Sequence, residues 1–591
     1  MAGAVIGLLT TFDCPALPTF ELSLALGYKY QSLCGGIPIG VIERGQYHSL
    51  PEVTISAFTE TGIAESSITV PLQRVYTGRK PVISTSLADT LCATLGVQGL
   101  LDQLNTTLGT YRLNNPILSS LLKDCITNDY DFGMAYGCLR RRWYAPGNSS
   151  TMRDALYRRE EKDRDKRRKA IIGNRIVETY LPPRRVWDLY SNRVVPCWTN
   201  WEWPDPISHA WMDEKDRTVV WTPINKYEWP VPIPKDANLN LIRIEMLNLG
   251  LEYVWLDVLC LRQVGGPGED LRVEEWKLDV PTIGAVYQNR DVVCYLSGLG
   301  RPLMLKEGDL ESDRSWFRRA WTMQEVGRSR VIAGDTPDGP LHAECKDGKY
   351  ETELLTRFHE QLQSMHQFEV REALEEMRHR VSTNPLDRIA GLAFLMESAS
   401  IPAYYESESF EEAWTALVNS MAPRCRAQLF FVCPEPGNAG KKWRPSWEQV
   451  TMQMSLPAYD FMPCIDVDRD ETGPRDEDSC DAECIEGLVR GLAVVEEGDR
   501  QGVLIVKDND GIEHAFKITA AHTYPIPEDT YTMIRTCVRN GSSRALGYGW
   551  VVGKSLLGGK YEKVSVLKIP LKEQSRIWGL RITERRQYIL I

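Results

Sequence analysis

The sequence lacks several features that would assign it to a class at once. No uninterrupted apolar run approaches the roughly 18 residues that a membrane-spanning helix needs. The apolar stretch within "MAGAVIGLLTTFDC" at the start has no basic residues before it, unlike a signal peptide. The 15 cysteines are an odd number, and they form no CxxC pair. We therefore expect a cytoplasmic protein without a membrane span, whose thiols are reduced.

Motifs of the commonest catalytic and metal sites are also missing. His359 and His366 stand seven residues apart, not four as on a zinc-binding helix, and no GxSxG marks a serine hydrolase. The "DFG" at 131–133 lacks the catalytic loop and strand lysine of a kinase. In "GYGWVVGKS", Tyr548 occupies the position where a phosphate loop needs glycine. We expect neither a metal ion nor a cofactor.

The net charge and the length of the chain limit the kind of partner and the number of domains that we expect. A net charge of −11 argues against nucleic acid as a partner. The 591 residues are too many for one core, so we expect three or four domains. Residues 1–150 carry no signal of their role. In 151–180, "RDALYRREEKDRDKRRK" interleaves both signs of charge, which favours a solvated connecting helix over a nucleic-acid arm, because the acidic residues would cancel the field of such an arm.

The sequence pattern changes again in the second half of the chain. Residues 341–465 contain helical patterns such as "TELLTRFHEQLQSMH". Residues 466–483, "DVDRDETGPRDEDSCDAE", are acidic and nearly devoid of apolar residues, which predicts an exposed linker. Residues 484–591 alternate apolar and polar residues between turn signals such as "DNDG", and this pattern predicts a β-rich C-terminal domain.

Residues 181–340 alternate strand and helix signals. "RRVWDLYSNRVV" predicts a hairpin-like segment, and "DPISHAW", "LEYVWLDVLCL" and "DVVCYLSG" predict short buried strands. Apolar residues at helical spacing up to Gly250, and again in "DVPTIGAVYQNR", predict helices between these strands. This order predicts an α/β fold with a doubly wound parallel sheet. His209, Asp257 and Ser297 then lie near the carboxyl ends of strands, where functional groups collect in such sheets.

The stretch "SWFRRAWTMQEV" (315–326) is predicted to be the third helix of this pattern. At ~100° per residue, Phe317, Trp321 and Glu325 share one ridge, and Glu325 lies where the apolar stripe meets the polar face. Two interpretations remain open. Glu325 is either a glutamate at the rim of the core, paired with a neighbouring arginine, or a carboxylate that the protein needs beside buried rings.

Several blocks in chain order resemble a known family. They are "RRVWDLYSNRVV", "ISHAW", "YVWLDVLCLRQ", "DVPTIGAVYQNRDVVCYLSG" and "SWFRRAWTMQEV", followed by "NPLDRIAGLAFLM" and "RPSWEQV". Together they resemble the HET (heterokaryon incompatibility) domain family of filamentous fungi over about 181–335, with weaker matches to about 450. The sequence departs from the family at Met212, where a glycine is usual, at Arg262, where an acid is usual, and in the long insert "VGGPGED".

HET domains in turn are similar to TIR domains, which are flavodoxin-like α/β modules. Many TIR domains cleave NAD at its nicotinamide–ribose bond with a glutamate, so the resemblance implies that Glu325 is the catalytic residue. No proton donor is needed, because nicotinamide leaves as a neutral molecule. The candidate binding residues are Trp211 or Trp255 for stacking on a ring, His209 or Arg318 for phosphate oxygens, and Asp257 for the pocket wall.

Structural interpretations of the same residues stay open. Tryptophans are mostly core residues, Arg318 and Arg319 suit a surface or ion-pair position, and Asp257 suits a turn. Two functions therefore remain. One is a signalling NAD glycohydrolase, switched on by self-association, that acts in nonself recognition and programmed cell death. The other is a non-catalytic HET module that only oligomerises or docks a partner.

Overall fold

The computed structural model describes residues 82–591, except 110–115, 144–149, 201, 328, 337, 366–369, 397, 399, 407, 453–464, 471–476, 495–497 and 536–547. More than half of the N-terminal region 1–150 thus lies outside the described residues. The described part of that region is helical, with α4 (Thr85–Ala88), α5 (Cys92–Leu108), α6 (Pro116–Thr127) and α7 (Phe132–Trp143).

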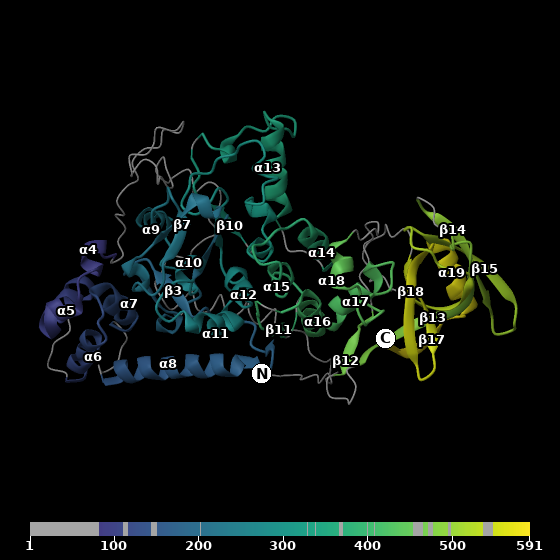
Figure 1. Cartoon of the computed structure of the whole chain (residues 1–591), viewed down its shortest axis with the longest axis horizontal. Helices are drawn as coiled ribbons and strands as arrows, with labels where there is room; N and C mark the ends of the chain where they lie inside the picture. Colours follow the sequence, from purple (N-terminus) through teal and green to yellow (C-terminus); the bar gives the residue numbers. More distant parts are fainter. Residues whose placement is uncertain are drawn as a thin grey trace, which may run out of the picture. The chain divides into compact units, whose positions relative to one another are not determined.

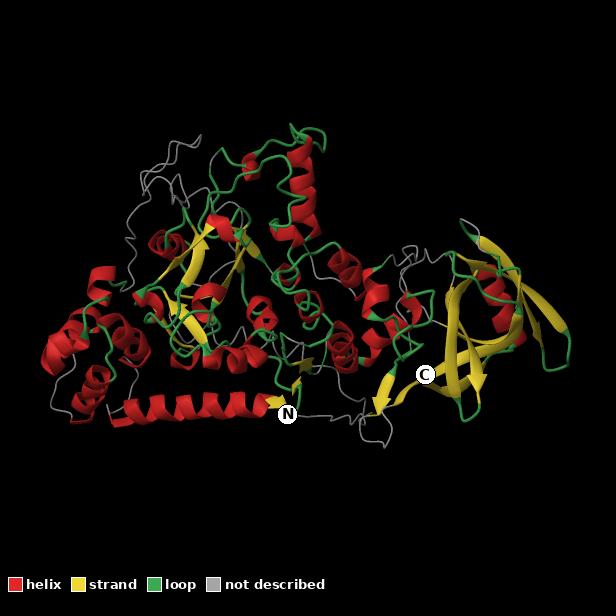
Figure 2. Ribbon diagram, viewed as in Figure 1, coloured by secondary structure: helices red, strands yellow, loops and turns green. Residues whose placement is uncertain are grey.

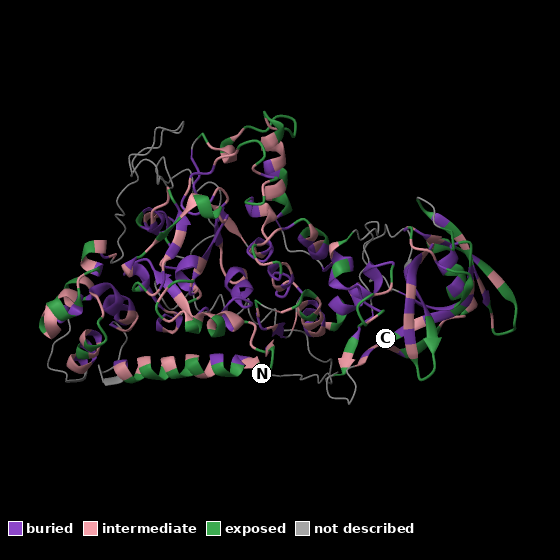
Figure 3. Ribbon diagram, viewed as in Figure 1, coloured by how far each residue is buried: buried purple, intermediate pink, exposed green. Residues whose placement is uncertain are grey.

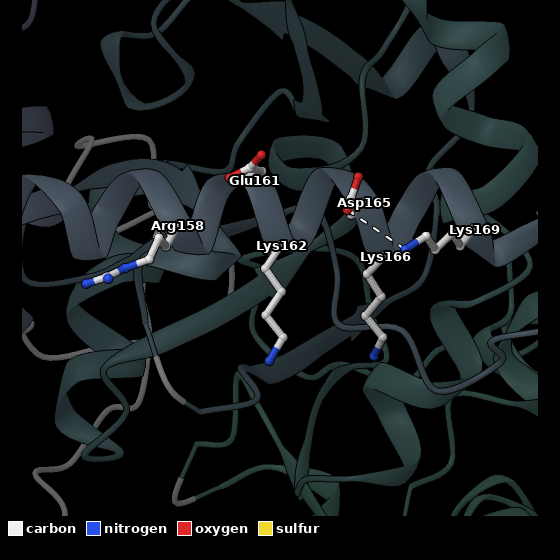
Figure 4. Close-up of a pocket in the computed structure, with 6 residues that line it drawn as sticks. All are labelled: Arg158, Glu161, Lys162, Asp165, Lys166 and Lys169. Atoms are coloured by element: carbon white, nitrogen blue, oxygen red, sulfur yellow. Dashed lines mark ion pairs between the residues drawn. The ribbon is translucent and has the colours of Figure 1, made fainter.

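The charged segment predicted as a connecting helix is helical over Ser150–Ala170 (α8), a straight helix in Figure 2. The chain then turns into β1 (Ile171–Ile172) and β2 (Arg175–Ile176), and β2 also pairs with β11 (Ile401–Pro402). In the hollow along α8 drawn in Figure 4, Lys162 and Lys166 extend to one side while Glu161 and Asp165 extend to the other. Both signs of charge therefore line this helix, as its sequence predicts.

A six-stranded sheet forms the centre of the segment 181–340, with the strand order β10-β9-β5-β8-β3-β4. Strand β5 pairs in parallel with both β8 and β9, β10 continues the parallel part, and the predicted hairpin β3–β4 adds antiparallel strands at one edge. The prediction of an α/β fold with a parallel sheet is confirmed at this level. The strands are β3 (Arg185–Asp188), β4 (Arg193–Pro196), β5 (Asp205–His209), β8 (Tyr253–Leu256), β9 (Val292–Tyr295) and β10 (Arg330–Ile332).

After the small hairpin β6 (Arg217–Val220) and β7 (Val231–Pro234), the strand connections contain the two predicted helices, α9 (Leu239–Asn248) and α12 (Ile283–Gln288). They also contain α10 (Asp257–Cys260) and α11 (Asp270–Asp279), which were not predicted; the predicted strand "LEYVWLDVLCL" therefore ends at Leu256, where α10 begins. The Asn238 side chain caps α9 at its start, and Gly250 follows its end with a φ of +81°, as the sequence predicts. All residues of β8 and β9 are buried, which explains their continuous apolar sequences (Figure 3).

The predicted single helix over 315–326 is wrong. The segment forms two 3₁₀ turns, Trp316–Arg318 and Trp321–Met323, and Arg319 between them is extended with φ −78° and ψ 138°. Arg319 forms an isolated parallel bridge with Val381, flanked by backbone hydrogen bonds of 2.7 and 2.9 Å to that distant segment. These bonds use backbone groups that an α-helix would need for its own ladder, so the three residues of the predicted ridge diverge.

The segment 341–465 is mainly helical, as its sequence predicts. Its helices are α13 (Glu353–Ser364), α14 (Val370–Arg378), α15 (Asp387–Ala390), α16 (Phe410–Ser420), α17 (Pro423–Val432) and α18 (Trp447–Thr451). Ser409 and Glu412 form a capping box at the start of α16. None of the helices in the described residues has the length and the apolar character that crossing a membrane requires.

The C-terminal region is β-rich, as predicted. Its largest sheet closes on itself because β13 pairs with both β14 and β16, and α19 (Leu571–Leu580) packs against it (Figure 1). The strands are β12 (Asp468–Asp470), β13 (Glu477–Arg490), β14 (Arg500–Lys507), β15 (Glu513–Ala520), β16 (Asp529–Arg535), β17 (Tyr548–Leu556), β18 (Lys560–Ile569) and β19 (Glu584–Leu590).

The predicted exposed linker over 466–483 is wrong in part, because β12 and the first half of β13 lie within it. Asp478 is only 2% exposed, and it forms an ion pair with Arg426 of α17, which is equally buried. The indole N–H of Trp443 also donates to Asp478, at 3.0 Å. The sequence pattern missed this strand because a buried partner compensates an acid that the pattern assigns to solvent.

Replacing Asp478 by alanine should destabilise the protein strongly, because the buried Arg426 guanidinium would lose its carboxylate partner. We expect the free energy of unfolding to fall by about 3–5 kcal/mol. The matched control is Asp481→Ala on the same strand. Its side chain is 55% exposed and pairs with an exposed arginine, so its loss should cost less than about 1 kcal/mol. Urea unfolding followed by circular dichroism measures both values, and equal losses would contradict a structural role for the buried pair.

Candidate functional site

The connections of the sheet change direction at β5. From β5 the chain proceeds to β8 on one side, and from β8 it crosses over β5 to β9 on the other side. In open α/β sheets, ligands bind outside the carboxyl ends of the strands at such a switch point. Ser208 and His209 are the last two residues of β5. Successive side chains of a strand point to opposite faces, so these two residues begin two neighbouring clusters.

The first cluster joins Ser208 to the segment 315–326, which contains the two 3₁₀ turns. The indole N–H of Trp316 donates to the Ser208 hydroxyl at 2.7 Å, and the Ser208 hydroxyl donates to Glu325 Oε2 at 2.5 Å. An indole nitrogen can only donate, and an ionised carboxylate can only accept, so the hydroxyl proton points toward Glu325 when that carboxyl is ionised. Among the described residues, no donor other than Ser208 contacts this carboxylate, so Oε1 is left for a further partner.

The Glu325 carboxyl is 9% exposed, and its environment shifts its acidity. The pKa of Glu325 is raised from 4.5 to about 7, mainly by burial. The nearby Asp257 carboxylate acts in the same direction, while the hydrogen bond from Ser208 and the charges of His209 and Arg319 act in the opposite direction. A carboxyl with this pKa exists in both protonation states near neutral pH. Shifts of this kind are common at functional sites, although structural networks also produce them.

The second cluster surrounds Asp257, the residue that follows β8. Its carboxylate accepts from His209 Nε2 at 2.9 Å, from the Trp211 indole N–H at 3.2 Å, and from the Val258 amide at 2.7 Å. Burial lowers the pKa of His209, but the Asp257 carboxylate more than offsets this effect, so the pKa is raised overall. The Asp257 side chain is 22% exposed, so the two clusters run from the buried Glu325 to solvent at Asp257.

The structure therefore brings four of the sequence candidates together, namely Glu325, His209, Trp211 and Asp257. It does not bring the other two into this group. Trp255 is 2% exposed in the core and packs edge-on against Tyr287, so neither face of its ring is open to a ligand. The Arg318 guanidinium pairs with Asp313 at 3.3 Å and donates to the Glu311 carbonyl, away from the clusters.

Sequence reasoning missed three residues that complete the arrangement. Ser208 was passed over beside His209, although a hydroxyl at the end of a buried strand is itself a signal. Trp316 belongs to the segment predicted as one helix, and that prediction hid its contact with Ser208. Arg217 lies after a loop and had no pattern that could identify it; its guanidinium lies 5.2 Å from the centre of the Trp211 ring. The predicted strand-end residue Ser297 instead closes a loop, with its hydroxyl 3.0 Å from the Met304 carbonyl.

Comparisons with protein-family models, with curated proteins and with solved structures found no match for this chain. Within the part of the chain that the structure describes, no group of three or more His, Cys, Asp or Glu side chains is arranged to hold a metal ion.

Glu325→Gln should change how stability depends on pH. The folded-state pKa of Glu325 is raised from 4.5 to about 7, so its contribution to stability is fully present below pH 4.5 and is lost as the pH rises to about 7. The glutamine variant cannot lose a proton there. Its free energy of unfolding should therefore rise relative to wild type over this interval, by up to about 3 kcal/mol.

Urea denaturation at pH 5 and at pH 8 measures this difference. Glu307→Gln, at an exposed glutamate, serves as the control and should show no comparable change between the two pH values. A wild-type to Glu325→Gln difference that stays constant from pH 5 to pH 8 would show that the carboxyl is not held in the buried environment described above.

Proposed function

We propose that residues 181–340 form a TIR-like HET domain with a flavodoxin-like fold, and that the protein cleaves NAD at its nicotinamide–ribose bond to signal nonself recognition and programmed cell death. The observation that carries this proposal is the Glu325 carboxylate, buried beside the end of β5 with one oxygen held by Ser208. The ordered sequence blocks and the parallel sheet are consistent with it.

The chemistry suits one buried carboxylate. Water cleaves NAD to nicotinamide, ADP-ribose and a proton, and the electron pair of the broken bond leaves on the nicotinamide nitrogen. The ribose carbon passes through an oxocarbenium-like state. An ionised Glu325 stabilises that positive charge, and Oε1, which accepts no hydrogen bond from the described residues, is the oxygen available for a ribose hydroxyl.

The surrounding charges favour the ionised form of Glu325 when substrate binds. At a pKa of about 7, a substantial fraction of Glu325 is already ionised at neutral pH. The positive charge of the nicotinamide ring lowers the pKa of Glu325 below this value, because a nearby cation favours the ionised carboxylate. His209, which Asp257 holds at 2.9 Å and whose pKa is raised, supplies a second positive charge nearby. His209 thus favours the ionised form of Glu325, whereas the Asp257 carboxylate acts on Glu325 in the opposite direction and contributes by holding His209.

The direct test is nicotinamide release from NAD by the concentrated, purified full-length protein. We expect release by wild type and at least about 100-fold slower release by Glu325→Gln, because the glutamine cannot neutralise the developing charge. Glu307→Gln is the matched control and should retain the wild-type rate. No release by wild type, or equal release by wild type and Glu325→Gln, removes the enzymatic proposal.

The alternative is a non-catalytic HET module for oligomerisation or docking. The observation that favours it is the chain of hydrogen bonds from Trp316 through Ser208 to Glu325, since this chain also packs the segment 315–326 against β5. Light scattering over a range of protein concentrations separates the two. Concentration-dependent self-association without any nicotinamide release supports the module, whereas release that rises with self-association supports the enzyme.

A further inference from the structure

Two arginines beside the clusters form no ion pair with a described residue, although the charges of Asp387 and Glu325 act on Arg319. Neither Arg217 nor Arg319 forms a side-chain hydrogen bond or an ion pair with any described residue, and both side chains are partly buried. The Nε atom of Arg217 is buried without a hydrogen-bond partner. Withdrawing a guanidinium from water without a compensating anion is costly. By contrast, the nearby Arg318 and Arg357 pair with acidic side chains.

The two guanidinium groups belong to segments that lie against each other. Arg314 links them through ion pairs to Asp213 at 3.5 Å and to Asp216 at 3.3 Å. Burial is the main cause that lowers the pKa of Arg319, the Asp387 and Glu325 carboxylates act against it, and the neighbouring charge of Arg217 lowers the pKa again. The two guanidinium groups thus lie close enough to repel each other, and both lie near the Glu325 cluster.

Arg217 is held in place by an aromatic ring. Its guanidinium lies 5.2 Å from the centre of the Trp211 ring, a cation–π distance, and the Trp211 indole N–H donates to Asp257. The other close ring is that of His209, whose centre is 5.4 Å from that of Trp211. Trp211 therefore positions Arg217 at the edge of the site, which differs from the substrate-stacking role that its sequence context implies.

We propose that Arg217 and Arg319 bind the diphosphate of a dinucleotide or nucleoside diphosphate at the mouth of the Glu325 site. Each guanidinium presents a planar fork of donors that matches two phosphate oxygens, so two arginines suit two linked phosphates. The negative charge of a diphosphate also removes the repulsion between the arginines. The inference rests on the proposed function in one respect: it places the diphosphate in the same molecule whose ribose reaches Glu325.

Calorimetric titration of the full-length protein tests the binding step without catalysis. The probes are inorganic pyrophosphate, ADP and ADP-ribose, with AMP as the monophosphate comparison. We expect the diphosphates to bind more tightly than AMP, and Arg217→Ala and Arg319→Ala each to weaken diphosphate binding by about 10- to 100-fold. Arg357→Ala, at an arginine already paired with Glu311, is the control and should bind like wild type.

Two outcomes overturn the inference: no diphosphate binding by wild type, or equal binding by wild type and both arginine variants. Arg217 begins an exposed hairpin strand, so its variant provides the test if Arg319→Ala fails to fold. Glu325→Gln separates this inference from the proposed function, because it should lose nicotinamide release but retain pyrophosphate binding. Diphosphate binding without NAD cleavage would leave the binding site intact and remove only the enzymatic proposal.

Discussion

The hydroxyl of Ser208 is the contact on which the arrangement of this site depends. It accepts from the Trp316 indole and donates to the Glu325 carboxylate when that group is ionised. These two bonds fasten the segment 315–326 to the end of the central strand. They also hold one oxygen of the Glu325 carboxylate, Oε2, in a hydrogen bond to the protein. A buried carboxylate with a single fixed donor is unusual, because burial penalises its charge unless several groups compensate it.

The charged residues around that contact become more exposed to solvent from the interior outward. Glu325 is buried, His209 and Asp257 form a hydrogen-bonded pair beside it, and Asp257 is partly exposed. Two arginines that form no ion pair with a described residue, Arg217 and Arg319, follow at the edge. A ligand with a cationic ring and a diphosphate at a fixed separation complements this gradient from end to end. A ligand with only the cationic ring or only the diphosphate would complement one end of this gradient and leave the other end without a partner.

The sheet could be predicted from the sequence because its signals are local. Short apolar runs marked β5, β8 and β9, and Gly250 marked the end of a helix. The helix over 315–326 could not be excluded in this way, because the bridge to Val381 that prevents it joins segments about sixty residues apart. The buried Asp478 was missed for the same reason, since its partner Arg426 lies far away in sequence.

The candidate site was predictable only where its residues end strands. His209 and Asp257 follow from that rule, and Glu325 and Trp211 came from the family resemblance. Arg217 could not be found from the sequence, because its place depends on how the loop before it packs against the segment 314–319. Arg318 pairs with Asp313, whereas the charge of Arg319 acts on Glu325, and the sequence offers no signal that separates these two neighbours.

The most direct measurement is a crystal structure of full-length Glu325→Gln with NAD bound, since this variant should hold the substrate without cleaving it. The account predicts that the anomeric carbon of the nicotinamide ribose lies roughly 3–3.5 Å from the side chain of residue 325. It also predicts that the diphosphate lies between Arg217 and Arg319. NAD bound with its ribose remote from residue 325, or no NAD bound at saturating concentration, would contradict it.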